Sequence, residues 1–572
     1  MSGKKNKIRF EKPTEEIQIH LPDYRVLSGP RGTAVGQFLA AIADEDMPPI
    51  IGAVVNGALR ELTYPIEYES QVAPITMGKA DGMRIYRRSL TLLLEAAFEE
   101  LFPGLYLNID HSVSFGGYFC RIVGRAPLSE EELILLKAKI QELVDRDIPI
   151  ERREIPIDEA IEYFEKRGHH DKVSLLRHRR KDYLMLYFLG DHCDYHHGYM
   201  VPSSGFIKWF DIQMAESGFT LRFPRRQNPR EILPLHKYPK LLSTFRRYGD
   251  WLELLGIESV GSLNDSIIDG RIREVILVSE ALHDQHIAEI ANQISNRRDE
   301  VRVVLIAGPS SSSKTTSSRR ISIQLLAHGL HPFALEMDSF FFDREETPKD
   351  ERGEYDYEHI DALDRPRLNR DLKKLIKGEE VQLPYYDFIN GTSKTGGSVK
   401  LLPNQIVILE GIHGLNPDLV SEVPDNQIFR IYISALTQLN LDRHNRVSTT
   451  DTRLIRRIVR DASTRGHSPR ETIQRWESVR RGEKKYIFPY QENADVMFNS
   501  ALVYELAVLK PLAEPLLRQV PFGTPEHIEV KRLLALLDWF LPLDSRMIPD
   551  DSLLREFIGG SILKDFKLWK KV

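Results

Sequence analysis

The stretch "AGPSSSSKTTSSRR" (residues 307–320) decides the interpretation of the second half of the chain. Gly308, Ser313, Lys314 and Thr315 fit the phosphate-loop pattern G-x-x-x-x-G-K-[ST] everywhere except at the second glycine, which is serine. A continuous apolar run, "VRVVLIA", precedes the loop, and a helical stretch follows it. This order of strand, loop, Lys-Thr and helix favours a phosphate loop over the alternative, a serine-rich turn before a helix.

A phosphate loop binds its anion through successive backbone N–H groups and a helix N-terminus. Lys314 is expected to reach the β- and γ-phosphates, and the hydroxyl of Thr315 to ligate Mg²⁺. Serine at position 313 costs about 1 kcal/mol if the backbone there has a positive φ. The residues predicted to hold the nucleotide are Gly308, Ser310, Ser311, Ser312, Ser313, Lys314, Thr315 and Thr316.

Three more apolar runs predict buried strands: "FALEMDSFF", "QIVILEGIHGL" and "IFRIYISAL". Because they alternate with helical stretches, they indicate a parallel sheet covered by helices. Ligands of such sheets bind beyond the carboxyl ends of the strands. Asp338 follows one run and is expected to accept a proton from an attacking hydroxyl, and Glu410 ends another and is expected to bind Mg²⁺. The alternative for each carboxylate is a cap on the following helix.

Four arginines in "TDTRLIRRIVRDASTRGHS" recur at i, i+3, i+4 and i+7 and share one helical face. They are Arg453, Arg456, Arg457 and Arg460. We interpret this face as a mobile lid that brings guanidinium groups to the transferring phosphate. The alternative is a salt-bridged face that Asp451 and Asp461 partly neutralise.

The bulk composition fits a globular protein of several domains, because 572 residues exceed one ordinary core. A net charge of −5 gives no bulk reason to expect nucleic acid or an anionic membrane as partner. The two cysteines, Cys120 and Cys193, favour a reducing compartment. The basic start lacks an apolar core and no apolar run approaches 18 residues, so we expect a cytoplasmic protein without membrane contact.

We expect a multidomain fold of the α+β and α/β classes. Residues 15–80 predict a small sheet packed on one helix, which Thr33 caps, and residues 81–225 an α+β unit. The predicted domains are 15–80, 81–225, a connector over 226–295, the parallel α/β unit over 296–510, and a helical extension over 511–572.

Residues of about 300–510 resemble the uridine kinase and phosphoribulokinase group of P-loop kinases. Seven stretches agree in that family's order: "GPSSSSKTT", "MDSFFFDR", "YDYEHIDALD", "PYYDF", "ILEGIHGL", "DTRLIRRIVRDASTRG" and "ADVMFNS". The resemblance implies ATP and Mg²⁺ as cofactors, with Asp338 as base toward a ribose 5′-hydroxyl. It also implies Asp361, Tyr386 and Arg453 at the substrate and Arg457 and Arg465 as lid arginines.

This sequence departs from the family at two places. Ser313 replaces the loop glycine, which bears on turnover. After "YDF", where uridine kinases carry a histidine that contacts the base, the chain has Asn390 and Gly391. Pyrimidine specificity therefore does not follow from the resemblance.

The N-terminal third resembles threonyl-tRNA synthetase. Residues 15–80 look like its ubiquitin-like (TGS) domain and 81–225 like its second additional, editing domain. Arg88 and Leu92 stand where that domain has two metal-binding histidines, whereas Cys193 and His197 keep its C-x-x-x-H pair. Two ligands do not make a zinc site, so we expect neither zinc nor editing.

The function predicted from the sequence is transfer of the γ-phosphoryl group of ATP to a hydroxyl of a nucleoside. The alternatives are a kinase of another sugar or sugar phosphate, and a regulatory protein that senses a nucleotide or RNA with little turnover. An RNA contact through the N-terminal modules and a homo-oligomer are left open.

Overall fold

The structure is a computed structural model that describes residues 15–113, 116–234, 238–350, 353, 355–387 and 390–566. Most of the basic start of the chain, up to residue 14, lies outside these ranges. Within them, no helix combines the length and the apolar character needed to cross a membrane.

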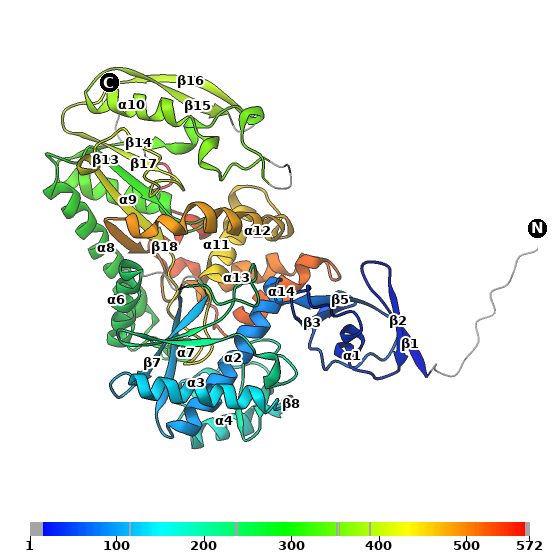
Figure 1. The fold of residues 1–572 in the computed structure, drawn as a ribbon. Helices are drawn as coiled ribbons and strands as arrows, with labels where there is room; N and C mark the ends of the chain where they lie inside the picture. Colours follow the sequence, from blue (N-terminus) through cyan, green and yellow to red (C-terminus); the bar gives the residue numbers. More distant parts are fainter. Residues whose placement is uncertain are drawn as a thin grey trace, which may run out of the picture.

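The N-terminal region forms a mixed five-stranded sheet in the order β2-β1-β5-β3-β4, packed on one short helix (Figure 1). The predicted small sheet on one helix is confirmed. Thr33 is not the cap: the helix begins after Ala34, and no side chain caps it. The elements are β1 (Glu16–His20), β2 (Val26–Pro30), α1 (Val35–Ala40), β3 (Ile50–Val55), β4 (Ala58–Arg60) and β5 (Ser70–Thr76).

The second region is α+β, with two antiparallel sheets in the orders β10-β9-β8 and β11-β12-β7-β6. Its long helix α2 is buried on all sides between Ser89 and Glu95 and supplies much of a hydrophobic core. The elements are α2 (Ala80–Leu101), β6 (Tyr106–Val113), β7 (Gly117–Val123), α3 (Glu130–Asp145), β8 (Ile150–Pro156), α4 (Ile157–Lys166), α5 (His170–Arg177), β9 (Tyr183–Leu189), β10 (His192–Asp194), η1 (Ser204–Phe206), β11 (Asp211–Ala215) and β12 (Gly218–Arg222).

Three helices follow, and they pack into the cores on either side rather than forming an extended linker. They are α6 (Pro239–Leu255), α7 (Val260–Ile268) and α8 (Ile272–Asn296).

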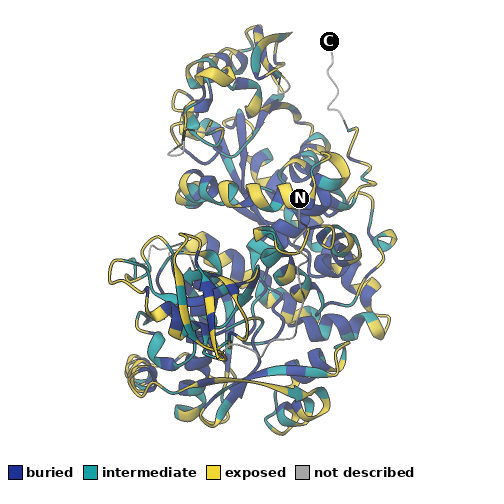
Figure 2. Cartoon of the chain, turned by 90° about the vertical axis from the view of Figure 1, so that its right-hand side faces the viewer, coloured by how far each residue is buried: buried dark blue, intermediate teal, exposed yellow. Residues whose placement is uncertain are grey.

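The next region contains a five-stranded sheet, parallel throughout, in the order β14-β17-β13-β18-β19. Figure 2 shows dark blue, buried strands in the middle of this region, covered by helices with yellow outer faces. The edge strand β14 is only partly buried. The four strands predicted from continuous apolar runs are present, and β19 adds a fifth. The elements up to the last strand are β13 (Val303–Ala307), α9 (Lys314–Ala327), β14 (His331–Glu336), η2 (Met337–Phe340), η3 (Arg344–Glu346), η4 (Ile360–Ala362), α10 (Arg365–Ile376), β15 (Val381–Asp387), β16 (Thr392–Val399), β17 (Gln405–Glu410), η5 (Asp425–Gln427), β18 (Ile428–Ser434), α11 (Thr449–Thr464), α12 (Pro469–Tyr486), η6 (Phe488–Asn493) and β19 (Val496–Asn499).

The C-terminal part is helical and returns to the middle of the molecule, where orange α14 lies beside blue α2 in Figure 1. Its elements are α13 (Glu505–Leu517), α14 (Pro525–Leu537), η7 (Ser545–Met547) and α15 (Arg555–Ile558). The last of them packs on α11, close to the phosphate loop.

Residues 435–448, which join β18 to α11 and are called here the anchor loop, tie the parallel sheet to the second region. The pairing of β6 with β7 shifts by one residue between Ile109 and His111, and the Ile109 N–H donates instead to Arg443 O at 2.8 Å. Lys172, fully buried, contacts Asp194 at 2.9 Å and Asp442 of the anchor loop at 3.2 Å. A buried ammonium paired with two carboxylates holds this contact in one geometry, because separating the charges would leave them uncompensated.

Candidate functional site

The predicted phosphate loop connects β13 to α9 at the carboxyl edge of the parallel sheet. Gly308 passes so close to β18 that a Cβ would lie 1.9 Å from the carbonyl oxygen of Ile433. This first glycine is therefore required by packing. The next residues turn the chain into α9, which begins at Lys314.

Two serines of the loop adopt the left-handed conformation, with φ of +58° at Ser311 and +63° at Ser313. Position 313 thus has the positive φ at which a serine carries a strain of about 1 kcal/mol that glycine would not. The hydroxyls of Ser311 and Ser312 are buried and have no hydrogen-bond partner. Buried hydroxyl donors without a partner suit a loop that receives an anion.

The arginine face of α11 contacts the loop, although not as a mobile lid. Arg453 and Arg456 are buried, and they donate to the carbonyl oxygens of Ser310 (2.8 Å) and Ser311 (3.4 Å). Each also forms a buried ion pair, Arg453 with Glu483 and Arg456 with Glu505. These two arginines are buried and donate to the loop backbone, so they support the loop from behind and are not positioned as a lid over it.

The other lid arginines are more accessible. Arg457 donates to the Ser310 hydroxyl at 3.0 Å and pairs with Asp461, which also pairs with Arg460. Arg465 is half exposed and lies near enough to Asp461 for a weak ion pair at 3.7 Å. The expected neutralisation by Asp461 is present, whereas Asp451 pairs with Arg532 of α14 instead.

An oxygen-rich group of side chains surrounds Lys314. The Thr315 hydroxyl donates to Glu410 Oε1 at 2.9 Å, and the Thr316 hydroxyl donates to Glu556 Oε2 at 2.8 Å. Burial raises the pKa of Glu410, and the charge of Glu556 raises it further, against the effect of Lys314. The Thr315 hydroxyl and the neighbouring carboxylates offer oxygen ligands, which Mg²⁺ prefers, and Lys314 balances only part of the carboxylate charge.

Asp338 lies in η2, two residues beyond the end of β14. Burial raises the pKa of its carboxyl group, Glu336 raises it further, and Lys314 and Arg465 oppose this shift. A carboxylate with a raised pKa at the carboxyl edge of the sheet suits a proton acceptor.

Glu358 is a further acidic group at the loop that the sequence analysis did not single out. It packs against Gly482 of α12. Burial raises its pKa to about 7, Glu483 contributes as a like charge, and Lys314 and Arg457 oppose the shift. Glu358 therefore changes charge near neutral pH.

The predicted acceptor residues lie on the β14 side of the sheet. Asp361 is exposed and forms an ion pair with Arg365. Tyr386, on β15, is buried, and its ring packs edge-on against Phe341 at 5.5 Å. At the place of the family's base-contacting histidine, the Arg344 guanidinium lies directly against Gly391.

Arg88, which stands where the resemblance predicted a departure from a metal-binding histidine, lies inside the second region. Arg88 lies against Gly198 and donates to the carbonyl oxygen of Tyr199 at 2.5 Å. In the described part of the chain, one group has metal-ligand geometry, and neither Cys193 nor His197 belongs to it. That group comprises Glu95, Asp194 and His196, with the Asp194 carboxylate already paired to Lys172.

The region of the parallel sheet is similar to known kinases. A family profile described as "Phosphoribulokinase / Uridine kinase family" matches residues 303–507. Uridine kinase of Ligilactobacillus salivarius is 32% identical over 206 residues, which are 36% of this chain and 87% of that protein. The solved structure of D-glycerate 3-kinase from Cryptococcus neoformans aligns with a TM-score of 0.26 and 16% identity, over 37% of this chain and 89% of that chain.

The N-terminal region matches a different group. Threonine–tRNA ligase of Laribacter hongkongensis is 32% identical over 202 residues, which are 35% of this chain and 32% of the ligase. The chain thus spans about a third of the length of the ligases that it matches. The parallel sheet with its phosphate loop and acidic residues is that of a P-loop kinase. The chain belongs to the phosphoribulokinase/uridine kinase family, and its N-terminal region is similar to threonine–tRNA ligases.

Replacing Ser313 by glycine should change ATP affinity by less than about threefold, or about 0.6 kcal/mol. The loop already has the left-handed conformation, so the strain that glycine relieves is nearly the same before and after ATP binds. Calorimetric titration with ATP and Mg²⁺ measures the effect. Ser313→Ala is the control, because it keeps the Cβ and loses the hydroxyl. A loss above tenfold in both variants would show that the hydroxyl itself works in the site.

Glu358→Gln should tighten ATP binding at pH 8 by about fivefold and change it little at pH 6. Above its pKa of about 7 the carboxylate is charged and repels the phosphates, whereas below it the neutral acid resembles glutamine. Comparing variant and wild type at each pH cancels the titration of ATP itself. Glu346→Gln, an exposed carboxylate, is the control. Equal affinity of Glu358→Gln and wild type at pH 8 would contradict this account.

Proposed function

We propose that the protein is an ATP-dependent kinase that transfers the γ-phosphoryl group to a hydroxyl of a nucleoside. The observation that carries the proposal is the meeting of three groups at one edge of the sheet: the phosphate-loop lysine Lys314, the Thr315–Glu410 pair and the Asp338 carboxyl group. Such a site combines anion binding, a metal-binding position and a base.

In this proposal the loop backbone and Lys314 hold the triphosphate. Lys314 now donates to the carbonyl oxygen of Pro309 at 3.2 Å, and burial lowers its pKa while Glu410 and Glu556 oppose the shift. A phosphate would replace that single neutral acceptor with charged ones. Arg457 and Arg465 are the arginines that would contact the transferred phosphoryl group, since Arg453 and Arg456 form buried ion pairs behind the loop.

Thr315 and Glu410 are the residues that would hold Mg²⁺. When bound, the ion neutralises charge on the β- and γ-phosphates. Glu410, whose pKa is raised by burial, would be held in its charged form by a cation at this position.

Asp338 accepts the proton of the acceptor hydroxyl as its oxygen bonds to the γ-phosphorus, and ADP leaves with the bridging oxygen. The raised pKa makes Asp338 a stronger base than an ordinary carboxylate, while Lys314 and Arg465 keep its charged form accessible.

A nucleoside is the acceptor that the family motifs and the likeness to a uridine kinase favour. Asp361 and Tyr386 are proposed to contact it. Arg453 was also predicted there, but its guanidinium is engaged by Glu483 and Ser310. A sugar or sugar phosphate is the alternative acceptor, because Asn390 and Gly391 stand in place of the base-contacting histidine and the Arg344 guanidinium lies against Gly391.

Asp338→Asn should leave ATP affinity nearly unchanged and lower kcat by roughly 10²-fold or more, because it removes the proton acceptor. The assay follows ATP consumption across a panel of nucleosides, sugars and sugar phosphates. Asp425→Asn is the matched control, since this exposed aspartate precedes β18 at the opposite edge of the sheet.

Unchanged kcat in Asp338→Asn would assign the base to another residue. ATP binding without turnover on any acceptor would contradict the kinase proposal and favour a protein that senses a nucleotide or RNA through its N-terminal regions.

A further inference from the structure

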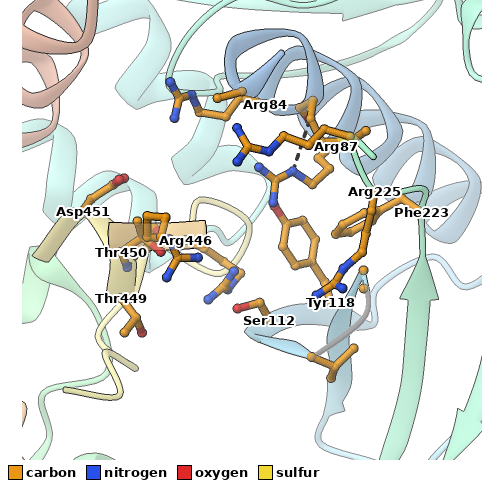
Figure 3. A pocket seen from close by; sticks show the side chains of 18 of the residues that line it. Arg84, Arg87, Ser112, Tyr118, Phe223, Arg225, Arg446, Thr449, Thr450 and Asp451 are labelled. Atoms are coloured by element: carbon orange, nitrogen blue, oxygen red, sulfur yellow. Dashed lines mark hydrogen bonds between the residues drawn. The ribbon is translucent and has the colours of Figure 1, made fainter. Parts of the chain in front are cut away.

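A large cavity separates the second region from the parallel sheet. Its volume is about 650 Å³, and α2, the ends of β6 and β7, the segment after β12, the anchor loop, α11, α12 and α14 line it (Figure 3). None of Gly308, Lys314, Asp338 and Glu410 belongs to its lining. It is therefore distinct from the phosphate-loop site, and the proposed function assigns it no role.

The cavity lining has a strong excess of positive charge. Ten arginine or lysine side chains line it, against four carboxylates. The carboxylates are already used by lining arginines: Asp81 and Glu529 pair with Arg84, Asp451 with Arg532, and Glu477 with Arg226. All four carboxylates of the lining are thus engaged in ion pairs.

Four of these cations form no ion pair with a carboxylate in the described part of the chain: Arg87, Arg88, Arg446 and Lys484. The Nε of Arg446 is buried and has no hydrogen-bond partner. Burial lowers the pKa of Arg88 to about 10 and that of Lys484 to about 8, and in both cases neighbouring arginines add to the shift. Partly buried cations that lower one another's pKa are stabilised by an anion.

Aromatic rings stand beside the cations. Figure 3 shows Arg446 and Tyr118 facing the same space from the anchor loop and β7. The Arg446 guanidinium lies 5.0 Å from the ring centre of Tyr118, which in turn packs edge-on against Phe223 at 4.9 Å. Guanidinium groups beside ring faces can bind a phosphate and a planar group together.

We propose that this cavity is a second ligand site, which binds a phosphorylated small molecule of nucleotide size. Phosphate oxygens would accept from Arg446, Arg87 and Lys484, and a planar group would pack on the aromatic wall. The proposed site adjoins the phosphate loop through Arg453, which lines the cavity and also donates to the carbonyl oxygen of Ser310.

Calorimetric titration of the full chain with inorganic tripolyphosphate tests the proposal. Wild type should bind two equivalents, Lys314→Ala and Arg446→Met one each, and the double variant none. Loss of the Arg446 contact should weaken the cavity site at least tenfold. If the phosphate loop bound no polyphosphate, wild type would bind one equivalent that Lys314→Ala keeps and Arg446→Met loses, which would still support the cavity site.

Arg87→Met, on a different element, repeats the test if Arg446→Met does not fold, and Arg246→Met, an exposed arginine of α6, is the control. A wild-type stoichiometry that Arg446→Met and Arg87→Met leave unchanged would overturn the proposal. Adenosine 5′-monophosphate and adenosine separate the contribution of phosphate from that of the ring. Adenosine binding as tight as the monophosphate would also overturn it.

Discussion

Two buried arginines of α11 determine how the phosphate loop is held. Arg453 and Arg456 are almost inaccessible to solvent, yet arginine keeps its charge in proteins, so each requires a carboxylate and further acceptors. Glu483 and Glu505 supply the charge, and the loop carbonyls supply the acceptors. Breaking one such pair leaves an uncompensated buried charge, at about 3–5 kcal/mol. The strained serine loop therefore keeps its shape because α11 cannot move away from it.

The phosphate-loop site and the cavity lie on opposite sides of Arg453 and have opposite electrostatic character. Around the loop, burial raises the pKa values of Asp338, Glu358 and Glu410, and a neighbouring carboxylate raises each further. A gathering of carboxylates there suits a metal ion with its nucleotide. The cavity on the other side is short of negative charge. Because Arg453 touches both, a ligand in the cavity and a triphosphate on the loop would act on the same side chain.

The parallel sheet could be predicted because strands that are buried on both faces are apolar along their length. The phosphate loop could be predicted because phosphate binding requires particular residue types at fixed spacings. The i, i+3, i+4 spacing correctly put the arginines on one face. The spacing could not distinguish a mobile lid from a helix that supports the loop. The difference depends on Glu483 and Glu505, which only the tertiary fold brings close to these arginines. Glu556 lies more than 200 residues beyond the loop and belongs to no motif. The cavity is formed by segments as distant as α2 and α14, which no local pattern relates.

The central claim is that the serine-rich loop binds the triphosphate, and hydrogen–deuterium exchange tests it most directly. Adding ATP with Mg²⁺ should slow amide exchange in peptides that cover residues 308–316 of the wild type, because bound phosphates accept from those N–H groups. The same peptides should remain unprotected in Lys314→Ala. Protection confined to peptides of the cavity, or absent altogether in the wild type, would contradict the account.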